Sequence, residues 1–297
     1  MKSPFFINEV YGLGYWLKDY AYYPKSWPLF TFMDHGMALS DRITPHEVEN
    51  PAPLIFKFSP RAVKLYKKES RKPVYNIVNP FVHYRRSRKI GVTKEAKGTL
   101  FFVAHSTSEI DDLTDWEEYI SQLKRIPEQF HPIDVCLHPT DMAKGLDRVF
   151  EQHGYKVYTA SDLASYRYTI NFYDILRNYR YSMSNILGSY FFYSVEMGIP
   201  FSLYGEEPKY FNKADKNIEQ GNYTSYQHFD TYKKAKALFS GFHAAISPEQ
   251  ETFVTYELGI HDTISRGKAC WLVYKALVLF ALRQPRTFLN TLRGRYN

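Results

Sequence analysis

The feature that most limits the possible folds of this chain is the regular alternation of short apolar stretches with helical patterns. In the second half the strand-like stretches are residues 99–104, 133–137, 155–159, 180–184 and 199–204. Helical patterns separate them, one beginning at Asp115 and another ending at Gly154. Such alternation is typical of consecutive βαβ units, so we expect an α/β fold with parallel strands.

The first half repeats this pattern on a smaller scale. Strand-like stretches occupy residues 29–33, 54–58 and 74–78. The helical patterns of the whole chain are residues 8–22, 59–70, 115–126, 142–153, 171–178, 190–197, 225–240 and 247–258. Residues 85–98 are polar and basic and contain two glycines, which predicts a linker. We therefore expect two Rossmann-like domains with parallel sheets, a short one at 1–95 and a larger one at 96–262, followed by a helical tail at 263–297.

Composition limits the class of protein. Among 297 residues 23% are charged, which is typical of a soluble globular chain. No uncharged apolar run reaches the length of a membrane span, and residues 1–6 do not resemble a secretory signal. The two cysteines, Cys136 and Cys270, form neither a disulfide framework nor a metal motif, so we expect a cytoplasmic protein.

The net charge of +7 is concentrated in the tail. No acidic residue follows Asp262, whereas the basic residues after it are Arg266, Lys268, Lys275, Arg283, Arg286, Arg293 and Arg295. A basic tail suits an anionic membrane surface better than nucleic acid, which we do not expect as a partner. Residues 271–282 are apolar almost all round, so this segment could also be a buried helix that returns to the first domain.

Polar clusters follow the carboxyl ends of the expected strands. They are residues 34–36, 105–107, 138–141, 182–189 and 205–207. Ligands of open parallel sheets bind at that edge, although surface loops are polar in any case.

The segment after residue 181 carries the strongest ligand signal. The candidate contacts are Ser182, Ser184, Asn185, Gly188 and Ser189. The hydroxyl and amide groups can donate hydrogen bonds, a glycine allows close approach, and the start of the next helix favours an anion. Alternatively, Ser184 and Asn185 only cap that helix.

The order of these clusters resembles that of bacterial surface-polysaccharide glycosyltransferases of the GT-B type. The matching residues run from His105-Ser106-Thr107 through His138-Pro139, Gly154 and Ser184-Asn185-x-x-Gly188-Ser189 to Gly198-x-Pro200 and Gly205-Glu206. In the first half, Asp34-His35-Gly36 resembles the Asp/Glu-His-Gly element of related capsule and lipopolysaccharide enzymes. The resemblance implies a two-domain GT-B-like fold and a nucleotide-sugar donor.

In the branch that uses CMP-sugars, which includes sialyl- and Kdo-transferases, a His-Pro pair and a serine-rich segment contact the donor. Carried over, this makes His138, Pro139, Ser184 and Ser189 donor contacts here. The acidic pair followed by glycine that serves as base in sialyltransferases is missing from this sequence, and its nearest counterpart is the Asp34-His35-Gly36 element.

Further side chains fit the chemistry of sugar transfer. Asp34 or His35 could take the proton of an acceptor hydroxyl, or could simply form a turn after a strand. His105 and Ser106 could line the domain interface, reach the donor or simply form a turn at the end of a strand. Glu206 and Glu207 could bind ribose hydroxyls or be ordinary loop carboxylates. The arginines at 85, 86 and 88 could meet an anionic substrate, but an ordinary solvated linker is the preferred interpretation.

We therefore expect a metal-independent glycosyltransferase without a cofactor, on the inner face of the cytoplasmic membrane. Its partners would be a nucleotide-sugar donor, a saccharide or lipid-linked saccharide acceptor, and an anionic membrane surface bound by residues 263–297. Two alternatives are a sugar-nucleotide hydrolase or epimerase, and a non-catalytic binding subunit of a polysaccharide assembly complex.

Overall fold

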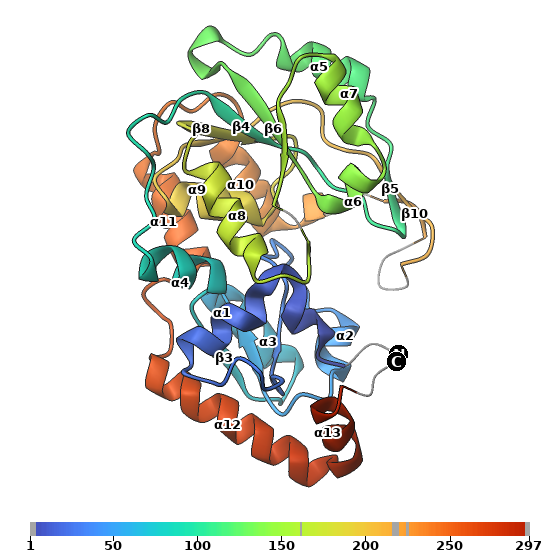
Figure 1. Ribbon diagram of the computed structural model, residues 1–297, viewed down its shortest axis with the longest axis vertical. Helices are drawn as coiled ribbons and strands as arrows, with labels where there is room; N and C mark the ends of the chain where they lie inside the picture. Colours follow the sequence, from blue (N-terminus) through green and yellow to red (C-terminus); the bar gives the residue numbers. More distant parts are fainter. Residues whose placement is uncertain (1–3, 161, 216–219, 224–225, 295–297) are drawn as a thin grey trace.

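A computed structural model of the protein describes residues 4–160, 162–215, 220–223 and 226–294. Figure 1 shows two parts, each built around its own parallel sheet, with the last helices, α12 and α13, lying against the part formed by the beginning of the chain. The expected α/β fold with parallel sheets and a C-terminal helical tail is confirmed. The domain boundaries at residues 95 and 262 stay predictions.

The larger sheet has five parallel strands in the order β7-β6-β4-β8-β9. These are β4 (Thr99–Phe102), β6 (Ile133–Leu137), β7 (Val157–Thr159), β8 (Tyr181–Ser184) and β9 (Phe201–Leu203). Phe101 of β4 lies between Val135 of β6 and Met183 of β8. Because the chain builds outward from β4 in one direction and then in the other, β4 and β8 flank the switch point where open sheets bind ligands.

Side chains alternate between the two faces of this sheet. Phe101 and Val135 pack on the side of α5 (Trp116–Leu123) and α7 (Leu146–Gln152). Leu100, Phe102 and Cys136 pack on the other side, which α8 (Arg167–Leu176) and α9 (Ser189–Glu196) cover, as Figure 1 shows. Both faces are therefore buried, as parallel sheets require.

The smaller sheet has three short parallel strands in the order β1-β2-β3. They are β1 (Phe32–Met33), β2 (Ile55–Lys57) and β3 (Val74–Asn76). Before and between them lie η1 (Phe6–Gly12), α1 (Leu13–Tyr20), α2 (Pro45–Glu49) and α3 (Pro60–Glu69). Ser59 caps α3 by accepting from two backbone N–H groups, and proline occupies its first position.

A third, antiparallel sheet was not expected from the sequence. It joins β5 (Ile110–Asp112), β10 (Tyr210–Asn212) and β11 (Gly221–Tyr223) in the order β11-β10-β5. Its strands are short and polar, and β5 and β10 are far apart in the sequence. A local hydrophobic pattern does not reveal such pairing.

The expected linker at 85–98 begins inside a helix, so its start was placed too early. The helix α4 (Pro80–Ser87) holds Arg85 and Arg86, which both bind the buried carboxylate of Glu196 on α9. The Arg85 contact is bidentate, with Nε 2.6 Å from Oε2. These two arginines thus join the two halves, whereas Arg88 caps the end of α4.

The remaining helical elements are η2 (Glu128–Phe130), α6 (Pro139–Ala143), η3 (Tyr226–His228), α10 (Asp230–Phe239), α11 (Pro248–Glu257), α12 (Arg266–Arg283) and α13 (Pro285–Leu292). The long helix α12 packs on the smaller sheet, where the Phe280 ring stacks on Phe30 with centroids 5.0 Å apart. No helix within the described ranges is long and apolar enough to cross a bilayer.

Candidate functional site

The turns after three strands of the two parallel sheets converge on one place. His35 follows β1, His105 follows β4 and His138 follows β6. The rings of His105 and His138 stack with centroids 4.4 Å apart. Tyr11 joins the group, because its ring centroid lies 6.1 Å from that of His35 and 6.2 Å from that of His138.

His138 is held by hydrogen bonds to both ring nitrogens. Its Nδ1 accepts from the backbone N–H of Thr140, 3.3 Å away, so the proton of the neutral ring lies on Nε2. Nε2 then donates to the Tyr11 hydroxyl oxygen at 3.3 Å. Burial, aided by nearby His105 and His35, lowers the pKa of His138 to about 3. The ring is therefore neutral at pH 7.

Tyr11 is a site residue that the sequence interpretation missed. The expected continuous helix over 8–22 is broken there, because Tyr11 adopts the left-handed conformation (φ 57°) near the end of η1, just before α1. Thr169 of α8 donates to its carbonyl oxygen at 2.9 Å. Burial raises the pKa of Tyr11 to about 12. A bulky residue with positive φ is strained backbone held by its surroundings, which is common at functional sites.

Asp34 and His35 have different surroundings. The Asp34 carboxylate binds Lys57 Nζ at 2.6 Å, and the same buried ammonium also pairs with Glu47. Desolvation lowers the pKa of His35, although neighbouring Asp34 opposes the shift. Protein atoms lie close to this ring, but its surface remains solvent-exposed. His35 is thus an exposed neutral imidazole beside a carboxylate that already has a partner.

The turn at 34–36 lies against the start of α9. The backbone N–H of Met37 donates to Ser189 Oγ at 2.8 Å. A Cβ at Gly36 would lie only 2.8 Å from the same oxygen, so glycine permits the close approach. Gly188 precedes the helix, and its first-turn N–H groups have no partner within the helix. This contact brings an element of the smaller sheet to an end of α9 that favours anions.

Three other side chains that were predicted to contact the donor lie in the interior of the protein. Ser182 donates to the Pro200 carbonyl at 3.2 Å, and Ser184 shares a 2.8 Å hydrogen bond with the Tyr190 hydroxyl. Asn185 accepts from the Ala104 N–H and contacts the carbonyl of Glu206. All three predicted residues are fully buried, so they tie β8 to its neighbours rather than face a ligand in this conformation.

Ser106 and Pro139 position the histidine turns. Ser106 Oγ donates to Asp141 at 2.5 Å and accepts from Lys144 Nζ at 2.8 Å. Burial raises the pKa of Asp141, and the hydrogen bonds from Ser106 oppose that shift. Pro139 is the first residue of α6. Ser106 thus fixes the loop that carries His105.

The acidic pair at the end of β9 is occupied by lysines. Glu206 pairs with Lys209 at 2.8 Å and Glu207 pairs with Lys236 at 2.8 Å. Tyr232 also lies 3.4 Å from Glu207. The expected contact with ribose hydroxyls would require these ion pairs to open, and it stays a prediction.

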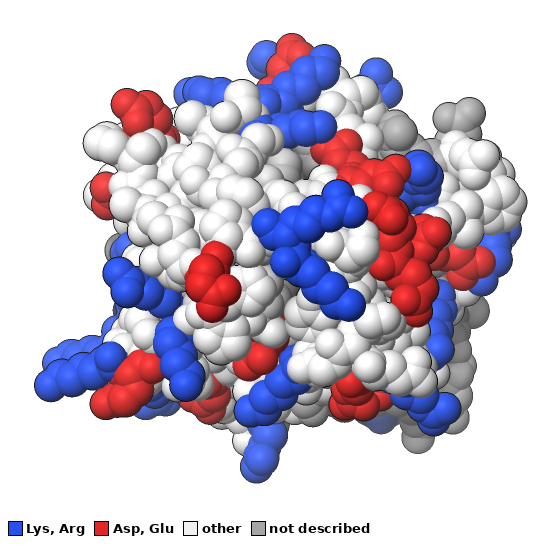
Figure 2. Space-filling view, turned by 90° about the horizontal axis from the view of Figure 1, so that it is seen from above, with Lys and Arg blue, Asp and Glu red and all other residues white. Residues whose placement is uncertain are grey.

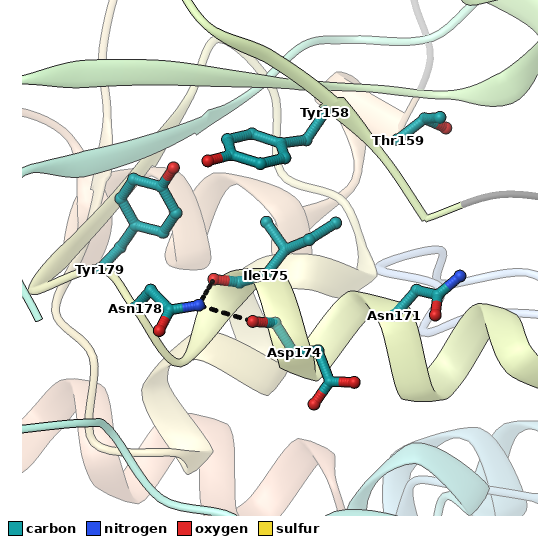
Figure 3. Close-up of a pocket in the computed structure, with 7 residues that line it drawn as sticks. All are labelled: Tyr158, Thr159, Asn171, Asp174, Ile175, Asn178 and Tyr179. Atoms are coloured by element: carbon teal, nitrogen blue, oxygen red, sulfur yellow. Dashed lines mark hydrogen bonds between the residues drawn. The ribbon is translucent and has the colours of Figure 1, made fainter.

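Two pockets among the described residues are lined by other side chains than the three histidines. The larger, about 250 Å³, opens between α8 and the edge strand β7. Figure 3 shows the side chains that line it: Tyr158, Thr159, Asn171, Asp174, Ile175, Asn178 and Tyr179. The smaller, about 40 Å³, reaches Asp34, Lys57 and Arg42. It has room for about one water molecule next to the Asp34 carboxylate.

Within the ranges that the structure describes, no three His, Cys, Asp or Glu side chains are arranged to hold a metal ion. The histidine group offers imidazole nitrogen atoms, a tyrosine hydroxyl and the start of a helix. Such groups can accept a proton from a hydroxyl and hold a phosphate.

No protein-family model matches this sequence, and no curated protein matches it either. Among solved structures, the wall teichoic acid polymerase TagF is 12% identical with a TM-score of 0.37, covering 86% of this chain and 69% of that chain. Its H548A form is 10% identical (TM-score 0.38; 78% and 59% covered). Its H444N form with CDPG is 10% identical (TM-score 0.34; 82% and 57% covered). This chain thus spans between 57% and 69% of the length of those polymerases.

Proposed function

We propose that this protein is a glycosyltransferase, which moves a sugar from a nucleotide-sugar donor to a growing bacterial surface polysaccharide or a lipid-linked acceptor. One observation carries the proposal. Turns from two separate parallel sheets bring His35, His105 and His138 together beside the start of α9. A donor bound by the loops of the larger sheet and an acceptor bound by the loops of the smaller sheet would meet there.

The donor side lies on the larger sheet. The nucleotide would bind at the switch point between β4 and β8, with its phosphate near the first turn of α9. His105 is exposed at that edge and can donate a hydrogen bond to a phosphate oxygen. Ser189 is half-buried beside it and already fixes the turn at 34–36. These groups would stabilise the leaving phosphate without a metal.

The acceptor side belongs to the smaller sheet. His35, neutral at pH 7, would take the proton of an acceptor hydroxyl. The oxygen would form a bond to the anomeric carbon while the bond from that carbon to the phosphate oxygen breaks. The nucleotide leaves with the electron pair, and the proton remains on His35. Asp34, held by Lys57, would stabilise the imidazolium that results.

Two further parts of the proposal rest on the sequence. The donor is a CMP-sugar, by the resemblance of the His138-Pro139 and 184–189 segments to the CMP-sugar branch. The product would be capsule or lipopolysaccharide, made on the inner face of the cytoplasmic membrane. A thermal-shift panel of CMP, CDP, UDP and GDP tests the donor, since a ligand that binds the native state raises Tm. A response to UDP or GDP alone would refute CMP.

Substitution of the base tests the reaction. With donor and acceptor present, His35→Asn should lower kcat/KM by about 10²- to 10⁴-fold, because the hydroxyl loses its proton acceptor. His261→Asn, at an exposed histidine, is the matched control. Turnover should survive a chelator such as EDTA. Full turnover of His35→Asn would disprove the role of His35, and a failure of every nucleotide to bind would disprove the transferase.

The exposure of His35 and His105 favours one alternative reaction. Water could occupy the place of the acceptor, and the protein would then hydrolyse the nucleotide-sugar. Incubation with donor but no acceptor separates the two, because a transferase should release little free sugar. A non-catalytic binding subunit would bind nucleotide but show neither reaction.

A further inference from the structure

The helix α12 has two opposite apolar faces. One face packs on the smaller sheet and consists of Ala269, Leu272, Val273, Ala276 and Phe280. The other points away from the protein and consists of Trp271, Tyr274, Val278 and Leu282, which we call the outer α12 face. Its spacings of three, four and four residues place these side chains on one stripe. The sequence left a buried helix and a membrane surface as alternatives, and the first describes only the inner face.

The outer α12 face is unusually exposed for its composition. Trp271 is 57% exposed, Val278 is 51% and Leu282 is 76%. The apolar surface continues on α13, where Leu289 and Leu292 are exposed. At its edge, Tyr274 packs on the buried ring of Tyr23, 5.1 Å away, and that ring in turn lies 6.0 Å from the exposed Trp27. Exposed apolar side chains gathered in this way mark an interaction site.

Positive charges border the same surface. The exposed basic residues of the two helices and the following turn are Lys268, Lys275, Arg283, Arg286 and Arg293. Lys275 Nζ lies 4.7 Å above the Trp271 ring, so a cation and an aromatic group stand together. Residues 263–294 contain no acidic residue. The opposite end of the molecule differs, because Figure 2 shows acidic and basic side chains interspersed there.

We propose that the outer α12 face, together with α13, docks on a bilayer that contains anionic lipids. An apolar stripe with tryptophan and tyrosine, flanked by lysine and arginine, is the composition of a helix that lies in the membrane interface. Two copies of this face would repel each other through their like charges. Nucleic acid would leave the apolar stripe without a partner. The helix has 18 residues, so about 27 Å of it would lie flat on the lipid surface.

Vesicle co-sedimentation with the full chain tests the proposal. Binding should be strong to phosphatidylcholine mixed with phosphatidylglycerol, weaker to phosphatidylcholine alone, and reduced by salt. The double variant Val278→Glu and Leu282→Glu should lower binding to the anionic vesicles by about tenfold or more. Because both side chains are exposed, the variant should keep the Tm of the wild type.

Leu113→Glu is the matched control, since Leu113 is an exposed leucine on the other half, and it should bind vesicles like the wild type. Replacing Lys275 and Arg286 with Gln should weaken binding and reduce its dependence on salt. Equal binding of the double variant and the wild type would overturn the proposal. So would a wild-type dimer that the double variant dissociates while vesicle binding is unchanged, because the surface would then join two copies of this chain.

Discussion

The five strands of the larger sheet pack between helices of the same half, whereas the three strands of the smaller sheet depend on a helix from the far end of the chain. Phe101 and Phe102 of the larger sheet meet α5 and α8, which follow in the sequence. In the cluster that covers the smaller sheet, Phe30 and Phe5 instead surround Phe280 of α12.

The two sheets also differ in what they bury. The strands of the larger sheet carry apolar side chains on both faces. The smaller sheet buries the ammonium of Lys57 between Asp34 and Glu47. A buried ion pair contributes less stability than an apolar contact, but it fixes the position of its members. The smaller sheet thus has a less stabilising contact at the place where the proposed base must be held in position.

The dependence on α12 gives the largest expected effect. Phe280→Ala removes a buried ring that the smaller sheet shares, and it should lower the free energy of unfolding by about 4 kcal/mol. Leu282→Ala, on the exposed side of the same helix, should cost less than about 0.5 kcal/mol. Urea denaturation measures both. Similar losses for the two variants would mean that α12 does not support the sheet.

The second-largest expected effect comes from the ion pairs of Lys57. Lys57→Met leaves the buried carboxylate of Glu47 and the partly buried carboxylate of Asp34 without their cation, which should cost about 3 kcal/mol of unfolding free energy. Lys64→Met, at an exposed lysine of α3, is the control and should have little effect. Urea denaturation measures both variants. Lys57→Met should also lose turnover, because Asp34 is no longer held by its ion pair. If Lys57→Met were as stable as the wild type, the smaller sheet would not depend on its charges.

The histidines make stability depend on pH. The pKa of His138 falls from 6.5 to about 3 on folding, so below pH 6.5 the unfolded chain binds a proton that the folded chain does not. His138 therefore makes its full contribution to the free energy of unfolding above pH 6.5, and this contribution is lost as the pH falls toward 3. We expect about 2 kcal/mol less unfolding free energy at pH 4.5 than at pH 7.

His138→Asn should flatten that dependence, because asparagine can cap α6 but does not titrate. Denaturation midpoints from pH 4.5 to 7 are the measurement. A control at the exposed His261 should keep the slope of the wild type. Identical slopes for all three proteins would show that His138 is not desolvated in the folded state.

The contact between the halves gives the smallest effect. Ser189→Ala leaves the N–H of Met37 without its 2.8 Å acceptor, which should cost about 1 kcal/mol. Ser87→Ala, which removes a local hydrogen bond within α4, is a comparison that leaves the halves joined. Nucleotide affinity should fall only in the first variant. If Ser189→Ala left the nucleotide affinity unchanged, the turn at 34–36 would not contribute to donor binding.

The sequence predicted the larger half well because its contacts are local. The strands at 99–104 and 133–137 correspond to β4 and β6, and the capping role of Asp115 is confirmed. The pattern of apolar runs and caps contains this information directly. The proximity of His105 and His138 also follows from their positions after the neighbouring parallel strands β4 and β6, whereas His35 comes from the other sheet.

The features that the sequence did not predict depend on contacts between residues far apart in the chain, which no local pattern shows. Tyr11 joins the histidines because α8 and α6 hold it, although its own segment reads as one helix. The fully buried position of Ser184 follows from Tyr190, whose hydroxyl meets it. Arg85 and Arg86 read as a solvated linker because their partner, Glu196, lies far along the chain.

The position of Phe280 has a consequence for synthesis on the ribosome. Phe5, Phe30 and Phe32 emerge early, but the ring that completes their cluster is translated near the end. The larger half has its own covering helices by the time α11 has been made. We therefore expect the part encoded first to mature last, with chaperones shielding its aromatic side chains until α12 arrives.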